Sequence, residues 1–162
     1  MHSRRRFSRR SCAALVSLVT WLGISPVCWS FYDGFEEGML YFSDCQAGAA
    51  IECVPGDNAN PGTLTSPKLD LSGIDVNAMP GGTHLLFSRG GVWNWSQTLR
   101  LDNPNTTALA PLTFGAYGSG AAPVLLMNSL VGIETGEWQN TTPDGGYVFR
   151  GLKLESAPTS PQ

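Results

Sequence analysis

Between residues 80 and 124 the sequence alternates short, strand-like apolar runs with glycine-rich corners. The run LLFSRGGVW is followed, after QTLRLDNPN, by PLTFGAYGSGAAPV, so a second strand and glycine corner repeat the first. Runs of this length are typical of β-strands, and repetition at a regular interval is typical of stacked repeats. The pattern predicts an all-β chain whose successive turns lie on one another. An antiparallel sandwich accounts for the same periodicity almost as well.

The segments LLFSRGGVW and LTFGAYGSGAAPV resemble the amino-terminal coils of right-handed parallel β-helix proteins, the pectin-lyase-like group. The resemblance covers about half of the chain after residue 30. It implies the start of a right-handed parallel β-helix, with two to three coils and a short amino-terminal cap. Because stacked strands lie about 4.8 Å apart, we expect interior ladders that join Leu85 to Leu112 and Phe87 to Phe114.

The same resemblance divides the chain after residue 30 into a cap region (31–79), the first β-helix coils (80–155) and an irregular tail (156–162). Apolar spacing becomes helical after Ser72, and Asp75 follows three residues later, which predicts a short capping helix. Such a helix would cover the open first coil. The last coil has no second cap, so we expect a truncated member or one whose exposed carboxy-terminal coil pairs with something else.

Residues 1–30 have the pattern of an export signal peptide. Five arginines precede a mostly apolar run without charges, from Cys12 to Trp29. This run is shorter than the ~20 residues of a membrane-spanning helix and contains Gly23 and Pro26, so we expect no stable membrane anchor. The sequence predicts a secreted or periplasmic protein, and twin-arginine and plain secretory export both fit.

The charge of the chain after residue 30 excludes some partners. All thirteen acidic residues lie there, with only five basic residues, so this part carries a net charge of −8. It has no basic run and therefore lacks the electrostatic signature of a nucleic-acid binder. We therefore expect no nucleic acid as a partner, and the family resemblance implies an extracellular polysaccharide instead.

Cys45 and Cys53 are the cysteines that remain after the signal segment, and in an oxidising compartment they predict a disulfide. A structural zinc site would need two further Cys or His ligands, and only His84 could supply an imidazole there. The run GDNANPGT at 56–63 predicts consecutive turns. A calcium loop is the alternative, but Ala59 and Pro61 offer no side-chain oxygens. We expect neither metal nor cofactor.

The catalytic residues are unknown from the sequence, although the resemblance suggests a polysaccharide lyase or glycoside hydrolase. Such enzymes need carboxylates or a base at a spacing set in three dimensions, and the acidic residues here are scattered through predicted corners. His84 lacks a recognisable nucleophile motif nearby. Arg89 could act as a base, but its place in SRGGV favours support of a turn. We expect no catalysis by this chain alone.

Trp93 and Trp95 share a face if their segment is extended, and paired indoles are good platforms for sugar rings. The alternative is that Trp93 packs into a corner of the coil. The leading interpretation is the exported amino-terminal portion of a parallel β-helix protein that binds or degrades polysaccharide. The alternatives are a non-enzymatic surface or adhesion β-solenoid and a small sugar-binding β domain.

Overall fold

The computed structural model describes residues 38–128, 132–136 and 145–156, which form an all-β structure. The strands are β1 (Met39–Phe42), β2 (His84–Ser88), β3 (Val92–Trp95), β4 (Leu99–Leu101), β5 (Leu112–Tyr117), β6 (Val124–Met127), β7 (Ile133–Thr135), β8 (Tyr147–Phe149) and β9 (Lys153–Ser156). No helix in these ranges is long and apolar enough to cross a membrane. The predicted signal peptide (1–30) and all but the first residue of the predicted tail lie outside the described residues.

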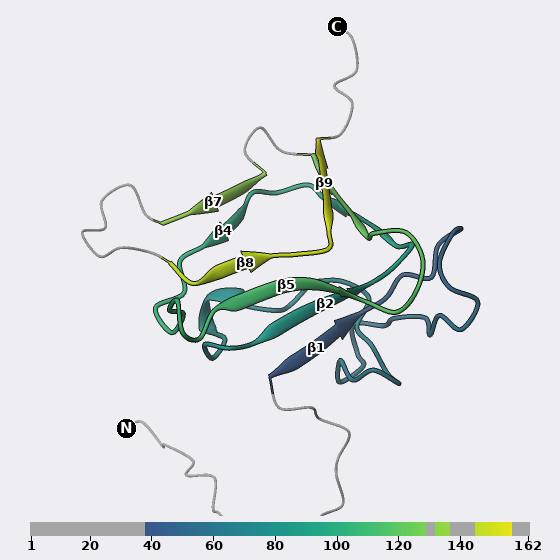
Figure 1. Cartoon of the computed structure of the whole chain (residues 1–162), viewed down its shortest axis with the longest axis horizontal. Helices are drawn as coiled ribbons and strands as arrows, with labels where there is room; N and C mark the ends of the chain where they lie inside the picture. Colours follow the sequence, from purple (N-terminus) through teal and green to yellow (C-terminus); the bar gives the residue numbers. More distant parts are fainter. Residues whose placement is uncertain (1–37, 129–131, 137–144, 157–162) are drawn as a thin grey trace, which may run out of the picture. The chain divides into compact units, whose positions relative to one another are not determined.

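The strands assemble into three parallel sheets. Their strand orders are β1-β2-β5-β8, β3-β6-β9 and β4-β7. In Figure 1 the first sheet is seen with β1, β2, β5 and β8 side by side. Along the chain, β2, β3 and β4 belong to three different sheets, and β5 returns beside β2. All six strand pairings in the described part are parallel, which rules out the antiparallel sandwich there.

The predicted neighbours β2 and β5 do pair, but the predicted register is wrong. Leu85 lies opposite Phe114, where we expected Leu112, and Phe87 lies opposite Ala116, where we expected Phe114. The error is a shift of two residues, which leaves every side chain on its expected face because the side-chain period of a strand is two. Alternation of apolar residues therefore predicts the buried face without fixing which residues stack.

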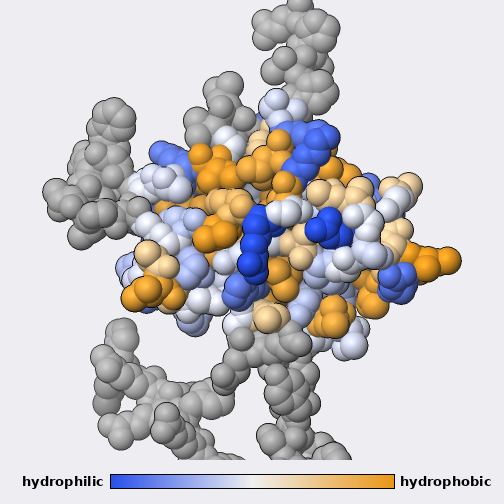
Figure 2. Space-filling model, in the orientation of Figure 1, coloured by the Kyte–Doolittle hydropathy of each residue, from blue (hydrophilic) through white to orange (hydrophobic). Residues whose placement is uncertain are grey.

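The core lies between the sheets and is built from alternate residues of the strands. Its buried side chains are Phe42, Val76, Leu85, Phe87, Trp93, Leu101, Leu112, Phe114, Leu125 and Met127. The rings of Phe114 and Phe149 stack with centroids 4.7 Å apart. Other hydrophobic residues reach the surface, and Figure 2 shows them interspersed with hydrophilic residues on the face it draws.

The predicted capping helix is reduced to one turn of 3-10 helix, η1 (Val76–Ala78). Its N-cap is Asp75, whose carboxylate accepts a hydrogen bond from the Asn77 amide at 3.0 Å. Ser72, after which the sequence predicted helical spacing, precedes Gly73, which has a φ of +76°. This left-handed conformation interrupts helical geometry, so the helix begins only after it.

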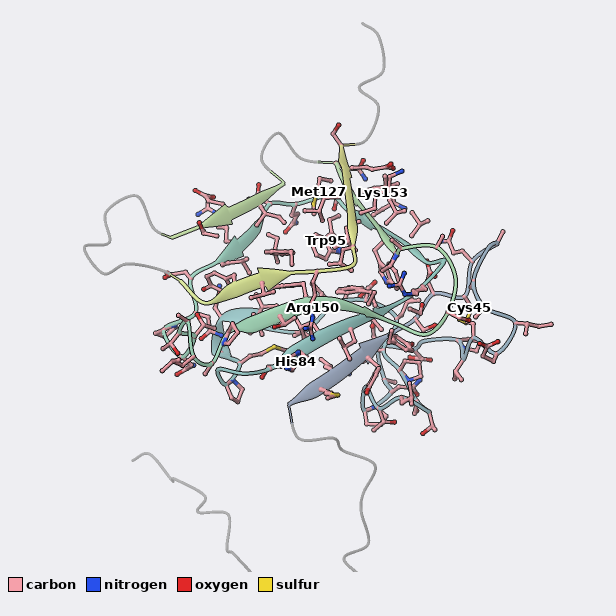
Figure 3. All side chains as sticks on the ribbon, in the orientation of Figure 1. Cys45, His84, Trp95, Met127, Arg150 and Lys153 are labelled. Carbon is pink, nitrogen blue, oxygen red and sulfur yellow. A yellow bond between two sulfur atoms is a disulfide. The ribbon has the colours of Figure 1, made fainter. Side chains whose placement is uncertain are left out.

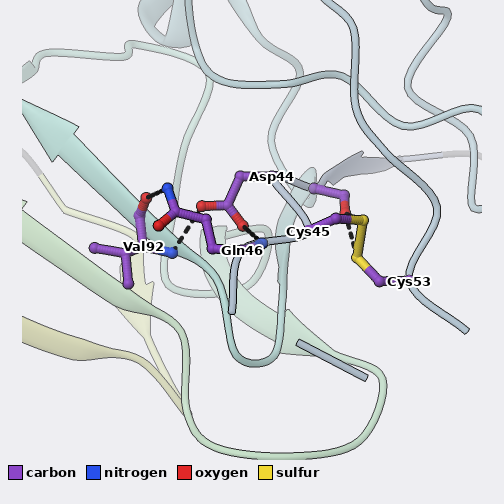
Figure 4. Close-up of a disulfide and its surroundings, with 6 residues drawn as sticks. Asp44, Cys45, Gln46, Cys53 and Val92 are labelled. Carbon is purple, nitrogen blue, oxygen red and sulfur yellow. Dashed lines mark hydrogen bonds between the residues drawn. A yellow bond between two sulfur atoms is a disulfide. The ribbon is translucent and has the colours of Figure 1, made fainter. Parts of the chain in front are cut away.

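Side chains that precede β2 in sequence cover the edges of two sheets. At β3, Asp44 Oδ2 accepts a hydrogen bond from Val92 N (2.9 Å), and Gln46 Nε2 donates to Val92 O (3.4 Å), as Figure 4 shows. At β4, Asn77 Nδ2 donates to Arg100 O (3.2 Å), and Asn77 Oδ1 accepts from Asp102 N (2.9 Å). These groups satisfy backbone positions that an adjoining strand would otherwise occupy.

Candidate functional site

The two tryptophans of β3 lie on the same face, as the sequence predicted for an extended segment. Trp93 is only 4% exposed, and its Nε1 donates a hydrogen bond to Leu69 O at 2.8 Å. Both indoles approach the ring of Phe87 edge-on, with centroids 5.0 Å away for Trp93 and 6.3 Å for Trp95. Trp95, labelled in Figure 3, stays partly exposed. Any aromatic surface offered to a ligand therefore comes mainly from Trp95.

A groove with a cavity volume of about 540 Å³ runs along β3 and the loop that follows it. This volume lies within the usual range of ligand sites. Both indoles line the groove. Its polar lining residues include Asp44, Gln46, Asp70, Ser72, Asn94 and Gln97. Most of these residues come from loops that are distant from β3 in sequence. The groove therefore depends on the fold, and it combines an aromatic ring with carboxylate, hydroxyl and amide groups.

The carboxylate of Asp70 is held as a hydrogen-bond acceptor in this groove. Its Oδ1 accepts from Ser72 N at 2.7 Å and from Asn58 Nδ2 at 2.8 Å. Burial raises the pKa of Asp70, but the hydrogen bonds from Ser72 and Asn58 lower it by more, so the pKa is below its ordinary value. Asp70 is therefore ionised near neutral pH and suits binding of a hydroxyl group better than proton donation.

The structure separates the other candidate residues from this groove. His84 begins β2 and lies in register with Met39 and Thr113, away from the groove-lining residues. Arg89 Nη1 donates to Gly120 O at 3.4 Å, so its guanidinium supports the neighbouring corner, as its sequence context favoured. No group of three or more potential metal-ligating side chains occurs within the described ranges.

The turn segment at 56–63 is ordered by the chain's own groups. Asp57 Oδ1 accepts from Ala59 N at 2.8 Å, which confirms the predicted side-chain-stabilised turn. Lys68 Nζ donates to the carbonyl oxygens of Asn58 (3.0 Å) and Asn60 (2.7 Å). Sequence reasoning missed this role of Lys68, because nothing in the local pattern relates the lysine to the turn.

The predicted disulfide between Cys45 and Cys53 is confirmed, with their Cα atoms 5.7 Å apart. The hydroxyl oxygen of Ser43 lies 3.4 Å from Cys45 Sγ and 3.1 Å from Cys53 Sγ. The bridge closes the loop that directly follows Asp44. It therefore constrains the segment next to the groove-lining Asp44.

No family model matches the chain, and no curated protein matches it. Among solved structures, the selenomethionine derivative of GH136 lacto-N-biosidase from Eubacterium ramulus matches 76% of this chain with a TM-score of 0.50 and 22% identity. The native form of the same protein matches 72% with a TM-score of 0.43 and 25% identity. The chain spans about a fifth of the length of those structures, 21% and 19% respectively. The first match shows a shared fold.

The predicted membership of the pectin-lyase-like group is wrong. A solved structure that shares the fold is a GH136 lacto-N-biosidase, and the described strands form three small parallel sheets without a closed solenoid. The segments that suggested the group are β2 with β3 and β5 with β6, each pair joined by a glycine corner. Short strands joined by a glycine corner are typical of stacked parallel sheets in general, so this pattern does not identify one family.

Proposed function

We propose that this chain is the exported amino-terminal portion of a parallel β-helix protein that binds an extracellular polysaccharide in the groove along Trp95. The observation that carries the proposal is the partly exposed indole of Trp95 in a groove lined by ionised and amide side chains. An aromatic ring stacks on the apolar face of a sugar, while carboxylates and amides bond its hydroxyl groups. The disulfide supports an extracellular or periplasmic location.

The order of the sheets supports the coiled part of this proposal. Each passage through three sheets, such as β2, β3 and β4, would be one coil, and β5 would begin the next. A crossover between parallel strands of one sheet is almost always right-handed, so a right-handed helix is the expected form. Asp44, Gln46 and Asn77 would then act as the cap, because they occupy the edges of β3 and β4.

The proposal also includes pairing at the other end of the sheets. No other described strand pairs with the far edge of β8 or of β9. Free edges of this kind accept additional strands. We therefore assign them to further coils or to a partner, which would supply the acid and base for any degradation of the polysaccharide. The carboxylates described in the groove, Asp44 and Asp70, already accept backbone hydrogen bonds.

Retention on polysaccharides tests the proposal. Affinity gel electrophoresis of the protein against a panel of soluble plant, algal and bacterial polysaccharides should reveal at least one that slows its migration. Trp95→Ala should weaken that retention about tenfold or more, and Trp95→Phe should preserve part of it, because the phenyl ring keeps some stacking surface.

Two further variants separate lost binding from lost folding. Gln97→Ala removes only an exposed amide in the groove and should weaken retention while the melting temperature stays unchanged. Leu109→Ala alters a side chain that is 98% exposed and lines neither pocket, so it should behave as the wild type. A folded wild type retained by none of the polysaccharides would contradict the proposal and favour the alternative of a non-enzymatic surface β-solenoid.

A further inference from the structure

A second pocket, with a cavity volume of about 590 Å³, lies on the outer face of the sheet that contains β1, β2 and β5. Its floor consists of side chains that alternate with core residues along these strands, namely Tyr41, Leu86, Ser88 and Tyr117. The disulfide loop provides a wall through Ala50, Glu52, Cys53 and Val54. This pocket shares no residue with the groove along Trp95.

The pocket is mainly apolar and aromatic. The rings of Tyr41 and Tyr117 meet edge-on, with centroids 5.1 Å apart and planes at 84°. Leu64, Leu86 and Val54 add aliphatic surface. A sugar would bury several hydroxyl groups here without partners, which is costly. The lining therefore suits a ring with few polar groups, and aromatic rings pack favourably on the faces and edges of tyrosines.

One polar atom in this pocket lacks a partner. Ser88 is 5% exposed, and its Oγ is buried without a hydrogen bond of acceptable geometry. Ser88 lies in register with Tyr117. Burial is the largest influence on the Tyr117 phenol and raises its pKa, so Tyr117 is neutral at physiological pH. A buried hydroxyl left unpaired destabilises the folded state, and a ligand that pairs with it would recover that loss.

The charged side chains of the pocket are already engaged. Arg89 Nη1 donates to Gly120 O at 3.4 Å, and Glu52 Oε1 accepts from Ser119 Oγ at 3.1 Å. One cation and one anion leave the pocket without a net charge, and the chain after residue 30 is strongly acidic. Anionic ligands are therefore disfavoured.

We propose that this pocket binds a small, uncharged aromatic compound with one hydroxyl group, which forms a hydrogen bond with Ser88 Oγ. The compound's ring packs against Tyr41 and Tyr117, and the disulfide loop forms the wall beside it. The Ser88 hydroxyl can donate or accept, so it matches a ligand hydroxyl in either role.

Titration calorimetry with 2-naphthol and naphthalene, which differ only in the hydroxyl group, tests the proposal. The wild type should bind 2-naphthol saturably and about tenfold more tightly than naphthalene. In Ser88→Ala this ratio should fall to about one, while the melting temperature of the free protein stays the same or rises because an unpaired hydroxyl is gone. Val54→Trp, at a site 41% exposed, should fill the pocket and abolish binding of both compounds.

Three outcomes would overturn the proposal. These are the absence of saturable 2-naphthol binding by the wild type, an unchanged ratio in Ser88→Ala, and tighter binding of 2-naphthoate than of 2-naphthol. Leu109→Ala provides the control, because it should leave both affinities unchanged. Polysaccharide retention is measured separately and depends on Trp95, so either proposal can fail alone.

Discussion

The ring of Phe42 stacks on the ring of Phe87, with centroids 4.9 Å apart and planes at 18°. The two residues lie opposite each other in the parallel pair β1–β2, so their stacking follows directly from the register. Phe87 also contacts Trp93 and Trp95 edge-on. A single core ring therefore joins the first strand to the tryptophans of the groove.

Phe87→Ala should cause a large loss of stability. The side chain is fully buried and its removal leaves a cavity, for which we expect a loss of about 3–5 kcal/mol in the free energy of unfolding. Phe87→Leu should cost clearly less, because it retains most of the apolar volume. Urea denaturation followed by circular dichroism measures both, and equal losses would contradict the expectation that the buried apolar volume of Phe87 contributes most of its stabilisation.

Asn77 should protect the amide of Asp102 from exchange. Asn77→Ala removes both hydrogen bonds to β4 and should cost about 1–2 kcal/mol. Asn77→Asp keeps an oxygen that can accept from Asp102 N but loses the donor to Arg100 O. Hydrogen exchange followed by NMR should therefore show faster exchange at Asp102 in Asn77→Ala than in Asn77→Asp. Identical rates in the two variants would contradict this assignment.

Loss of the Cys45–Cys53 disulfide should weaken both the fold and the outer pocket. The bridge spans eight residues, and loop-entropy reasoning gives it a contribution of about 2.5 kcal/mol. The double variant Cys45→Ser, Cys53→Ser should lose that stability and bind 2-naphthol at least tenfold more weakly, because Cys53 lies in the pocket wall. Addition of reductant to the double variant should have no effect, and a drop in stability there would indicate another cause.

Acid should remove the stabilisation that Asp70 provides. Its pKa is lowered on folding, so the ionised carboxylate stabilises the folded state fully above its ordinary pKa of 3.8. This contribution is lost as the pH falls from that value through the lower pKa of the folded state. Asp70→Asn should melt below the wild type at pH 7, and the difference should close by about pH 2–3. Leu109→Ala, which changes no titratable group, should show no such convergence.

Local sequence patterns predicted the strands, but the groove is formed by contacts between residues far apart in sequence, which these patterns do not reveal. The alternation at Leu85 and Phe87 gave the buried face of β2, and the glycine corner at Gly90 is required because a Cβ there would lie 2.3 Å from Gly48 O. The observed register of β2 and β5 differs from the predicted one by two residues, because alternation alone permits any even shift. Asp44 and Asn77 reach strands far along the chain, and no periodicity marks such side chains.

Lys68 stabilises the turn at 57–60 without a bound metal ion. Its ammonium group occupies the place among the Asn58 and Asn60 carbonyl oxygens where an external cation could have been recruited. A covalently attached charge cannot be washed out or removed by a chelator. The shape of this turn should therefore be insensitive to the concentration of metal ions in the surrounding solution.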